Sequence, residues 1–232
     1  MAKTFTKIGK EITIAVKQGG PDVVGNSRLR ALMAEARSEN MPKDNVEKAI
    51  KRALEKNQGD FKEVVFEGYG PHGIAYLVET ATDNNTRTVA NVRSYFTKCG
   101  GSLGTSGSVS FMFDHKCVFR IKYQEGMDID ELQLALCECD DDPEVFIEEQ
   151  EDKDENITKN VVIYGAYESY GAIQKYIEDN GYELVSGGFE RIPNVELKDV
   201  TPEQRETLDK LTGLLEDDDD VTNVYSTLKP AE

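Results

Sequence analysis

Residues 160–192, NVVIYGAYESYGAIQKYIEDNGYELVSGGFERI, decide the fold of the chain. NVVIYGA has the apolar, β-branched run of a strand, and ESYGAIQKYIEDNG has apolar residues at helical spacing before a closing glycine. YELVSGGFERI then has the composition of another strand. Ahead of these lie a strand, a helix and a strand, in the segments CVFRIK, DIDELQLALCEC and EVFIEEQ. The order β-α-β-β-α-β predicts a ferredoxin-like unit over residues 117–192.

The flanks of this unit repeat its pattern. A strand in GIAYLVETAT, a helix over residues 86–98 and a strand in SVSFMF come before it. NVELK, a helix and VTNVYSTL come after it, and this last helix has a capping box, with Thr201 as N-cap and Gln204 three residues on. We therefore predict a discontinuous ferredoxin-like domain over residues 61–116 and 193–232, with the 117–192 domain inserted into it.

Residues 1–60 predict a third, small helical domain, which completes an α+β fold of three domains. Two apolar stripes have helical spacing: Phe5, Ile8, Ile12 and Val16, then Leu29, Leu32, Met33 and Ala36. In NMPKDNVEKAIKRALEKN, residues 40–57, Asp44 and Glu47 have the spacing of a capping box that opens a third helix. One face of that helix is expected to hold Val46, Ala49, Ile50, Ala53 and Leu54. The opposite side gathers Lys48, Lys51, Arg52 and Lys56 in a basic ridge.

The charge of the chain is unevenly spread. Its formal net charge is −17, yet residues 1–57 hold 12 Lys and Arg against 7 Asp and Glu. A basic end on an acidic body indicates contact with a polyanion through one surface only, with a solvated helical face as the alternative.

The glycine-rich stretch KCGGSLGTSGSVSFMF, residues 98–113, raises the question of a nucleotide site. No lysine follows the glycines as in a Walker-type loop, and Gly-x-Gly-x-x-Gly is absent. The stretch also runs from a helix into a strand, whereas both phosphate cradles precede a helix. The sequence favours a structural corner, and no nucleotide cofactor is expected.

Catalytic and metal-binding patterns are absent from the sequence. The four cysteines and two histidines lack zinc-ligand spacing, so reduced structural thiols are expected. Gly-x-Ser-x-Gly is missing, and His72 lies in a Pro-Gly turn. The acidic run at residues 216–220 lacks the alternating spacing of a calcium loop and is interpreted as a solvated corner. Phe111 and Phe113 lack the flanking residues of an RNA-recognition strand and are interpreted as core. We expect a non-enzymatic, cytoplasmic protein with no cofactor, no metal, no small-molecule substrate and no membrane segment.

Three stretches together resemble the YebC/PmpR family. They are NMPKDNVEKAIKR, the block FEGYGPHGIAYLVETATDNNTRTVANVRSYFTKCGGSLGTSGSVSFMF and the ending LLEDDDDVTNVYSTL. The resemblance implies three domains and a non-enzymatic protein. Members are described as DNA-binding transcriptional regulators, while others act in translation, among them a mitochondrial activator of cytochrome oxidase synthesis. Family members usually carry a further basic stretch before FTKIGKEI, with a Lys-Trp or similar pair, and this chain has no Trp.

Two partners follow as hypotheses: promoter DNA, for a transcriptional regulator, or ribosomal RNA, for a ribosome-associated translation factor. The family description favours DNA, and repulsion between a duplex and the acidic body favours the ribosome. The candidate phosphate contacts are Lys3, Lys7, Lys10, Arg28, Arg30, Lys43, Lys48, Lys51, Arg52, Lys56, Arg87 and Arg93.

Overall fold

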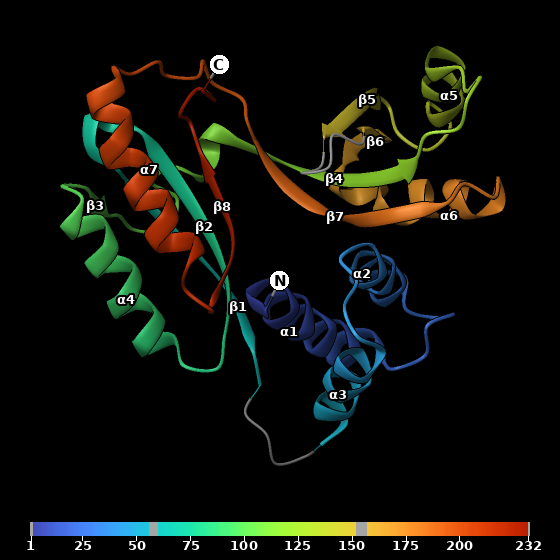
Figure 1. Ribbon diagram of the computed structural model, residues 1–232, viewed down its shortest axis with the longest axis horizontal. Coiled ribbons are helices and arrows are strands. Elements are labelled where there is room, and N and C mark those ends of the chain that lie inside the picture. Colours follow the sequence, from blue (N-terminus) through green and yellow to red (C-terminus); the bar gives the residue numbers. More distant parts are fainter. Residues whose placement is uncertain (1, 56–59, 152–156, 232) are drawn as a thin grey trace. The chain divides into compact units, whose positions relative to one another are not determined.

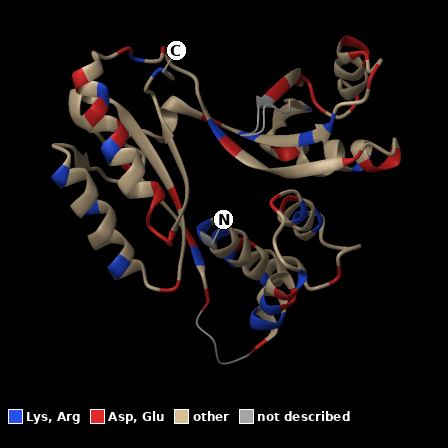
Figure 2. Cartoon of the chain, viewed as in Figure 1, with Lys and Arg blue, Asp and Glu red and all other residues tan. Residues whose placement is uncertain are grey.

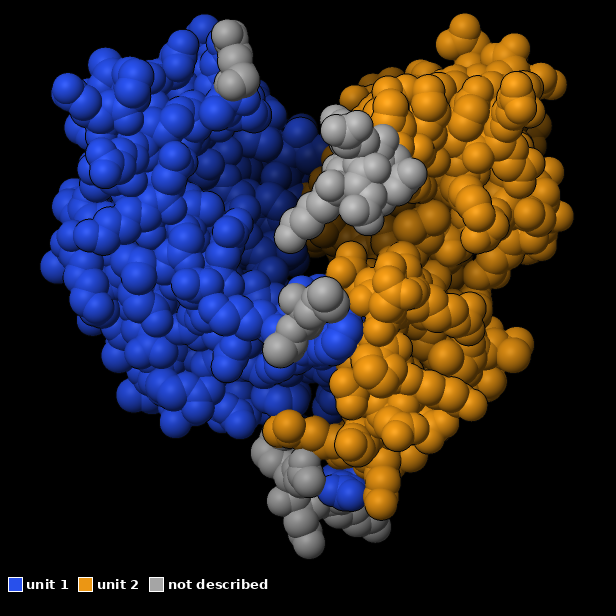
Figure 3. All heavy atoms as spheres, viewed as in Figure 1, with its two compact units in different colours: residues 1–14, 55–114, 191–232 blue, residues 15–54, 115–190 orange. Residues whose placement is uncertain are grey.

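The computed structural model describes residues 2–55, 60–151 and 157–231, and the chain forms two compact units (Figures 1 and 3). Residues 1–14, 55–114 and 191–232 make up unit 1, and residues 15–54 and 115–190 make up unit 2. Each unit holds one four-stranded sheet, and helices form the N-terminal region. The predicted α+β class is confirmed, while the domain limits at residues 60, 116 and 192 stay a prediction.

The sheet of unit 1 has the strand order β3-β1-β2-β8. β1 (Lys62–Tyr69) and β2 (Ala75–Thr82) form an antiparallel hairpin, and β3 (Ser102–Leu103) and β8 (Val221–Ser226) pair with its two edges. α4 (Asn85–Lys98) and α7 (Pro202–Glu216) pack against one face (Figure 1), where Tyr76, Phe96 and Leu211 are fully buried in one cluster. The capping box of Thr201 and Gln204 opens α7 as predicted.

Two strands predicted for unit 1 are wrong. In SVSFMF, Ser110–Met112 forms a 3₁₀ turn and β4 begins only at Phe113, so Val109 and Phe113 are buried while Phe111 is 65% exposed. NVELK contributes a single bridge, between Lys198 and Leu228. The sheet uses β1 instead, which the sequence analysis did not assign. The first elements of this sheet are therefore β-β-α-β rather than β-α-β.

The sheet of unit 2 has the strand order β5-β6-β4-β7, and the predicted β-α-β-β-α-β order is confirmed. Its elements are β4 (Phe113–Lys122), α5 (Ile129–Leu136), β5 (Glu144–Glu151), β6 (Ile157–Ala166), α6 (Tyr170–Asp179) and β7 (Leu184–Pro193). Cys117, Phe119 and Ile121 alternate along β4 toward one face, as the period of a strand requires, and they are fully buried with Ile173 of α6.

The helix α2 (Ser27–Ser38) belongs to the core of unit 2. Its Ala31 packs in the same cluster as Phe119. A side chain at Gly187 would meet Phe119 at 2.8 Å and Ala31 at 3.1 Å, so glycine on β7 lets α2 approach the sheet closely. This packing was not predicted from the sequence.

The remaining helices are α1 (Ala2–Gly19) and α3 (Lys43–Leu54). α1 is one continuous helix whose residues up to Ile14 belong to unit 1 and whose later residues belong to unit 2. α3 differs from prediction at both ends: Asp44 lies inside the first turn rather than at the cap, and Leu54 is 58% exposed. Within the described ranges, no helix is long and apolar enough to cross a membrane.

Candidate nucleic-acid interface

Three predicted phosphate contacts, Lys3, Lys7 and Lys10, lie on one side of α1, because they are spaced by four and three residues. All three reach the acidic corner, which we define as residues 216–220, from the last residue of α7 to the start of β8. Lys3 Nζ lies 2.6 Å from an Asp217 carboxylate oxygen, and Lys7 Nζ donates to the Glu216 carbonyl at 3.1 Å. These cations are therefore engaged within unit 1.

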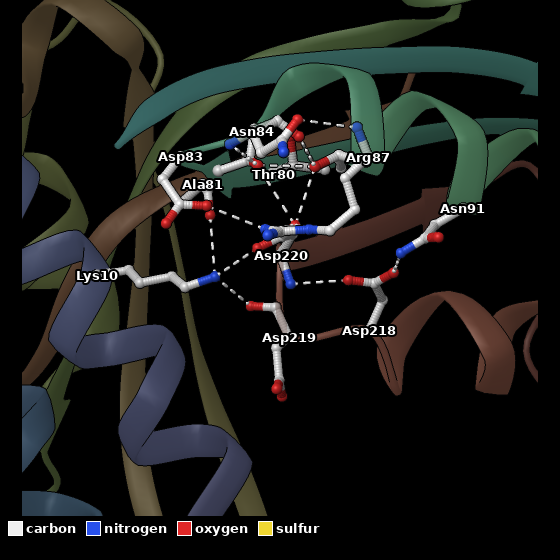
Figure 4. Close-up of polar contacts among 12 residues, drawn as sticks. Lys10, Thr80, Ala81, Asp83, Asn84, Arg87, Asn91, Asp218, Asp219 and Asp220 are labelled. Carbon is white, nitrogen blue, oxygen red and sulfur yellow. Dashed lines mark hydrogen bonds and ion pairs between the residues drawn. The ribbon is translucent and has the colours of Figure 1, made fainter. Parts of the chain in front are cut away.

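Lys10 makes the deepest contact of the three (Figure 4). Its Nζ lies 2.7 Å from Asp220 Oδ1 and also donates to the carbonyls of Asp219, at 2.8 Å, and Ala81, at 3.2 Å. The Lys10 side chain is 11% exposed and that of Asp220 is 5% exposed. Such a pair is screened little by salt, so Lys10 is an internal counter-ion rather than a free phosphate contact.

Asp220 is the acceptor around which the corner is arranged. Arg87 Nη2 donates to Asp220 Oδ2 at 2.6 Å, and the Thr88 hydroxyl donates to the same oxygen at 2.9 Å. Arg87 also pairs with Asp83 (Figure 4). Burial raises the pKa of a carboxyl group, but the hydrogen bonds from Lys10, Arg87 and Thr88 outweigh it and lower the pKa of Asp220. The predicted phosphate contact Arg87 thus serves this carboxylate.

The interpretation of residues 216–220 as a solvated corner is wrong for two of the five residues. Asp220 is buried, and the Asp218 carboxylate accepts hydrogen bonds from Asn91 and from the Tyr95 hydroxyl, at 3.1 and 3.0 Å. Burial and the hydrogen bond to Asp218 raise the pKa of Tyr95 to about 12, so the hydroxyl remains a donor. Glu216, Asp217 and Asp219 are exposed. Among the described residues, no group of His, Cys, Asp and Glu has the arrangement of a metal site.

The glycine-rich loop holds an anion of the chain itself. The buried carboxylate of Glu67, on β1, accepts the backbone N–H groups of Gly107, Val109 and Ser110 at 2.7 to 2.8 Å. Burial raises the pKa of this carboxyl group, but the three amides outweigh it and the pKa is lowered. The same three bonds fold residues 107–110 into a turn, which explains why no strand forms there.

Two arginines at the start of α2, Arg28 and Arg30, also have partners within unit 2. Arg30 forms a two-pronged pair with Glu178 of α6, at 2.7 and 3.3 Å, and donates to the carbonyls of Val23 and Val24. Arg28 donates to the Gln18 side chain at 3.1 Å. These contacts fix the start of α2 against α6 and α1, which is a structural role.

Figure 2 shows Lys and Arg gathered on α3, where the basic ridge lies. Lys48 and Lys51 are exposed, and in the part of the chain that the structure describes the side chain of neither forms a hydrogen bond or ion pair. Lys43 is exposed with only a 3.7 Å contact to Glu47, and Arg52 is half-buried. Lys56 lies outside the described residues. Away from the ridge, Arg93 on α4 is exposed.

Arg37, in the last turn of α2, is an exposed cation that was not among the sequence candidates. A basic residue in a last turn was a usable signal, although it equally fits compensation of the helix dipole.

Two family models match the chain in succession. The TACO1/YebC protein N-terminal domain matches residues 1–56, and the TACO1/YebC second and third domain matches residues 61–228. The chain belongs to the TACO1/YebC family. The resemblance to YebC/PmpR proteins seen in the sequence is thereby confirmed.

Relatives in this family carry a regulatory name. A protein of Parabacteroides distasonis, 58% identical over 99% of this chain and 90% of its own length, is named probable transcriptional regulatory protein. A Flavobacterium johnsoniae protein of the same name is 54% identical over 99% of this chain and 92% of its own length. The crystal structure of a conserved hypothetical protein from Aquifex aeolicus covers the whole chain, with a TM-score of 0.80 and 32% identity over 91% of that protein. At family level, the chain is a regulator.

Proposed function

We propose that this regulator is a non-enzymatic, cytoplasmic DNA-binding protein that contacts phosphates through the basic ridge of α3. The observation that carries the proposal is the contrast among the predicted cations. Most of those on α1, α2 and the start of α4 are engaged by carboxylates or carbonyls, while Lys48 and Lys51 are exposed and unpaired in the described structure. A phosphate would therefore meet these two lysines without first displacing another anion.

The position of the ridge favours phosphate contact in a second way. Val46 and Ala49 are buried on the opposite side of α3, so the ridge is presented on a helix whose orientation is fixed by packing. The sequence has no helix-turn-helix spacing, so the contact would position the protein on the nucleic acid rather than read bases.

The test is salt-dependent binding of a labelled 20-base-pair DNA duplex, followed by fluorescence anisotropy. The double variant Lys48→Glu, Lys51→Glu should lose most of the affinity, and the slope of log affinity against log salt should fall by roughly 0.9 for each lost contact. A matched control is Lys175→Glu, Lys210→Glu, which reverses two exposed lysines on α6 and α7 and gives the same net charge.

Equal loss in both variants would show a general effect of net charge, and no loss in either would reduce the ridge to a solvated face. The same variants also test the ribosome-associated alternative. If the ridge variant binds DNA like the parent but no longer sediments with ribosomal particles at moderate salt, the target is ribosomal RNA.

A further inference from the structure

We propose that the acidic corner competes with nucleic-acid phosphate for the lysines of α1. Lys3 is then a second phosphate contact, which forms only when phosphate replaces Asp217. This inference rests on the proposed function for its ligand. Its evidence lies entirely within unit 1, in the contacts of Lys3, Lys7 and Lys10 with residues 216–220.

The three contacts form a series from weak to strong. Lys3 and Asp217 meet with side chains 55% and 74% exposed, whereas Lys10 and Asp220 are almost completely buried. Exposed ion pairs contribute little net stability because water and salt screen them, but a buried pair is costly to break. Of the three lysines, only Lys3 can therefore exchange its partner under ordinary conditions.

Lys7 occupies the intermediate position. It donates to the carbonyl of Glu216 and no carboxylate lies within ion-pair distance in the described structure. Burial lowers the pKa of Lys7, which indicates that its charge is incompletely compensated where it stands. An incoming phosphate oxygen next to Lys3 would supply the missing negative charge, since the two lysines are one helical turn apart.

The acidic corner therefore occupies Lys3 with a carboxylate where a nucleic acid would place a phosphate. Asp217 presents an exposed carboxylate to Lys3 in the way that a phosphate would, and its own pKa is lowered by the hydrogen bond and charge of Lys3. Exchange of Asp217 for phosphate leaves the buried Lys10–Asp220 pair in place, so α1 stays anchored. The corner sets a threshold: the polyanion must outcompete Asp217 before Lys3 contributes to binding.

The experiment compares the parent with Asp217→Asn, Lys3→Ala and the double variant, using the same 20-base-pair duplex over a series of NaCl concentrations. Asp217→Asn should raise the affinity severalfold and steepen the salt slope by roughly 0.9, because one additional phosphate contact releases its counterions. In the Lys3→Ala background, the same change should alter neither quantity. Asp209→Asn, an exposed residue of α7, is the control for reduced overall repulsion.

Two results would overturn the inference: Asp217→Asn and Asp209→Asn having equal effects, or the effect of Asp217→Asn persisting without Lys3. A heparin column separates this inference from the proposed function. If Asp217→Asn elutes from heparin at higher salt than Asp209→Asn although no variant binds DNA, the competition holds and the proposed DNA target falls. If DNA binds but the variants behave alike on both probes, the DNA target holds and the competition falls.

Discussion

At the scale of single residues, two buried carboxylates explain most of what the sequence made ambiguous. Asp220 binds two of the cations that were predicted to meet phosphate, Lys10 and Arg87, and Glu67 accepts the backbone amides of the loop that raised the question of a nucleotide site. Both side chains are 5% exposed or less, and the pKa of each is lowered because donated hydrogen bonds outweigh burial. In each case an anion of the chain occupies the place where an external anion was considered.

The first residue-scale prediction concerns Asp220→Asn. Breaking a buried ion pair leaves Lys10 without its counter-charge, so the free energy of unfolding at pH 7 should fall by about 3–5 kcal/mol. Urea unfolding measures this fall, and Asp219→Asn, a neighbouring exposed carboxylate, should change the stability very little.

The pH dependence of this effect has a definite sign. Because the folded-state pKa of Asp220 is lowered, its stabilisation is present above the unfolded-state pKa and is lost as the pH falls through the folded-state value. The stability gap between parent and Asp220→Asn should therefore narrow as the pH is lowered from about 5 toward 2. A gap that stays constant over that range would show that the charge of Asp220 has no part in it.

The second residue-scale prediction concerns Glu67→Ala. The change leaves three backbone amides near residues 107–110 without their acceptor, at about 1–3 kcal/mol for each one that stays buried and unpaired. Thermal unfolding should show a large loss of stability. Calorimetric titration of the parent with ATP should show no saturable binding, because Glu67 already occupies these amides; a saturable isotherm would contradict this account of the loop.

At the scale of elements, the ββ hairpin and the turn before β4 show where pattern analysis fails. Alternating Val109, Phe111 and Phe113 predicts one strand face, yet the turn at Ser110–Met112 sends Phe111 to solvent. Apolar residues do alternate here with the period of a strand. The backbone forms a turn instead, because Glu67, 40 residues before Gly107, accepts its amide hydrogen bonds. Local patterns do not contain such contacts, whereas the capping box of α7 is local and was predicted correctly.

This difference gives a paired prediction. Phe113→Ala should cost about 3–5 kcal/mol in unfolding free energy, because it empties a buried site that Val109 and Leu77 share. Phe111→Ala should stay within about 0.5 kcal/mol, since its ring is 65% exposed. Denaturant unfolding of the two variants compares them directly, and equal losses would restore the strand that the sequence suggested.

At the scale of the whole molecule, the sequence predicted the helices and strands better than it predicted which charged side chains pair with one another. The α+β class and the β-α-β-β-α-β order of the elements from β4 to β7 depend on periodicity and helix signals that neighbouring residues carry, and both were correct. The basic N-terminal region was also visible. The ion pairs that its cations form could not be predicted, because Lys10 and Asp220 are 210 positions apart and no residue near either one indicates the other. Which cations are free for a ligand is therefore knowable only after folding.

That separation of 210 positions has a consequence for synthesis of the chain. A nascent chain emerges from its N-terminus at roughly 5–20 residues per second, and domains generally fold as units when their segments are complete. All segments of unit 2 have been made by residue 190, whereas unit 1 needs β8 and the corner just before it. Lys10 must therefore wait on the order of ten seconds or more for its counter-ion. α1 is made long before the corner that it pairs with, and Lys3, Lys7 and Lys10 stay exposed to solvent during that interval.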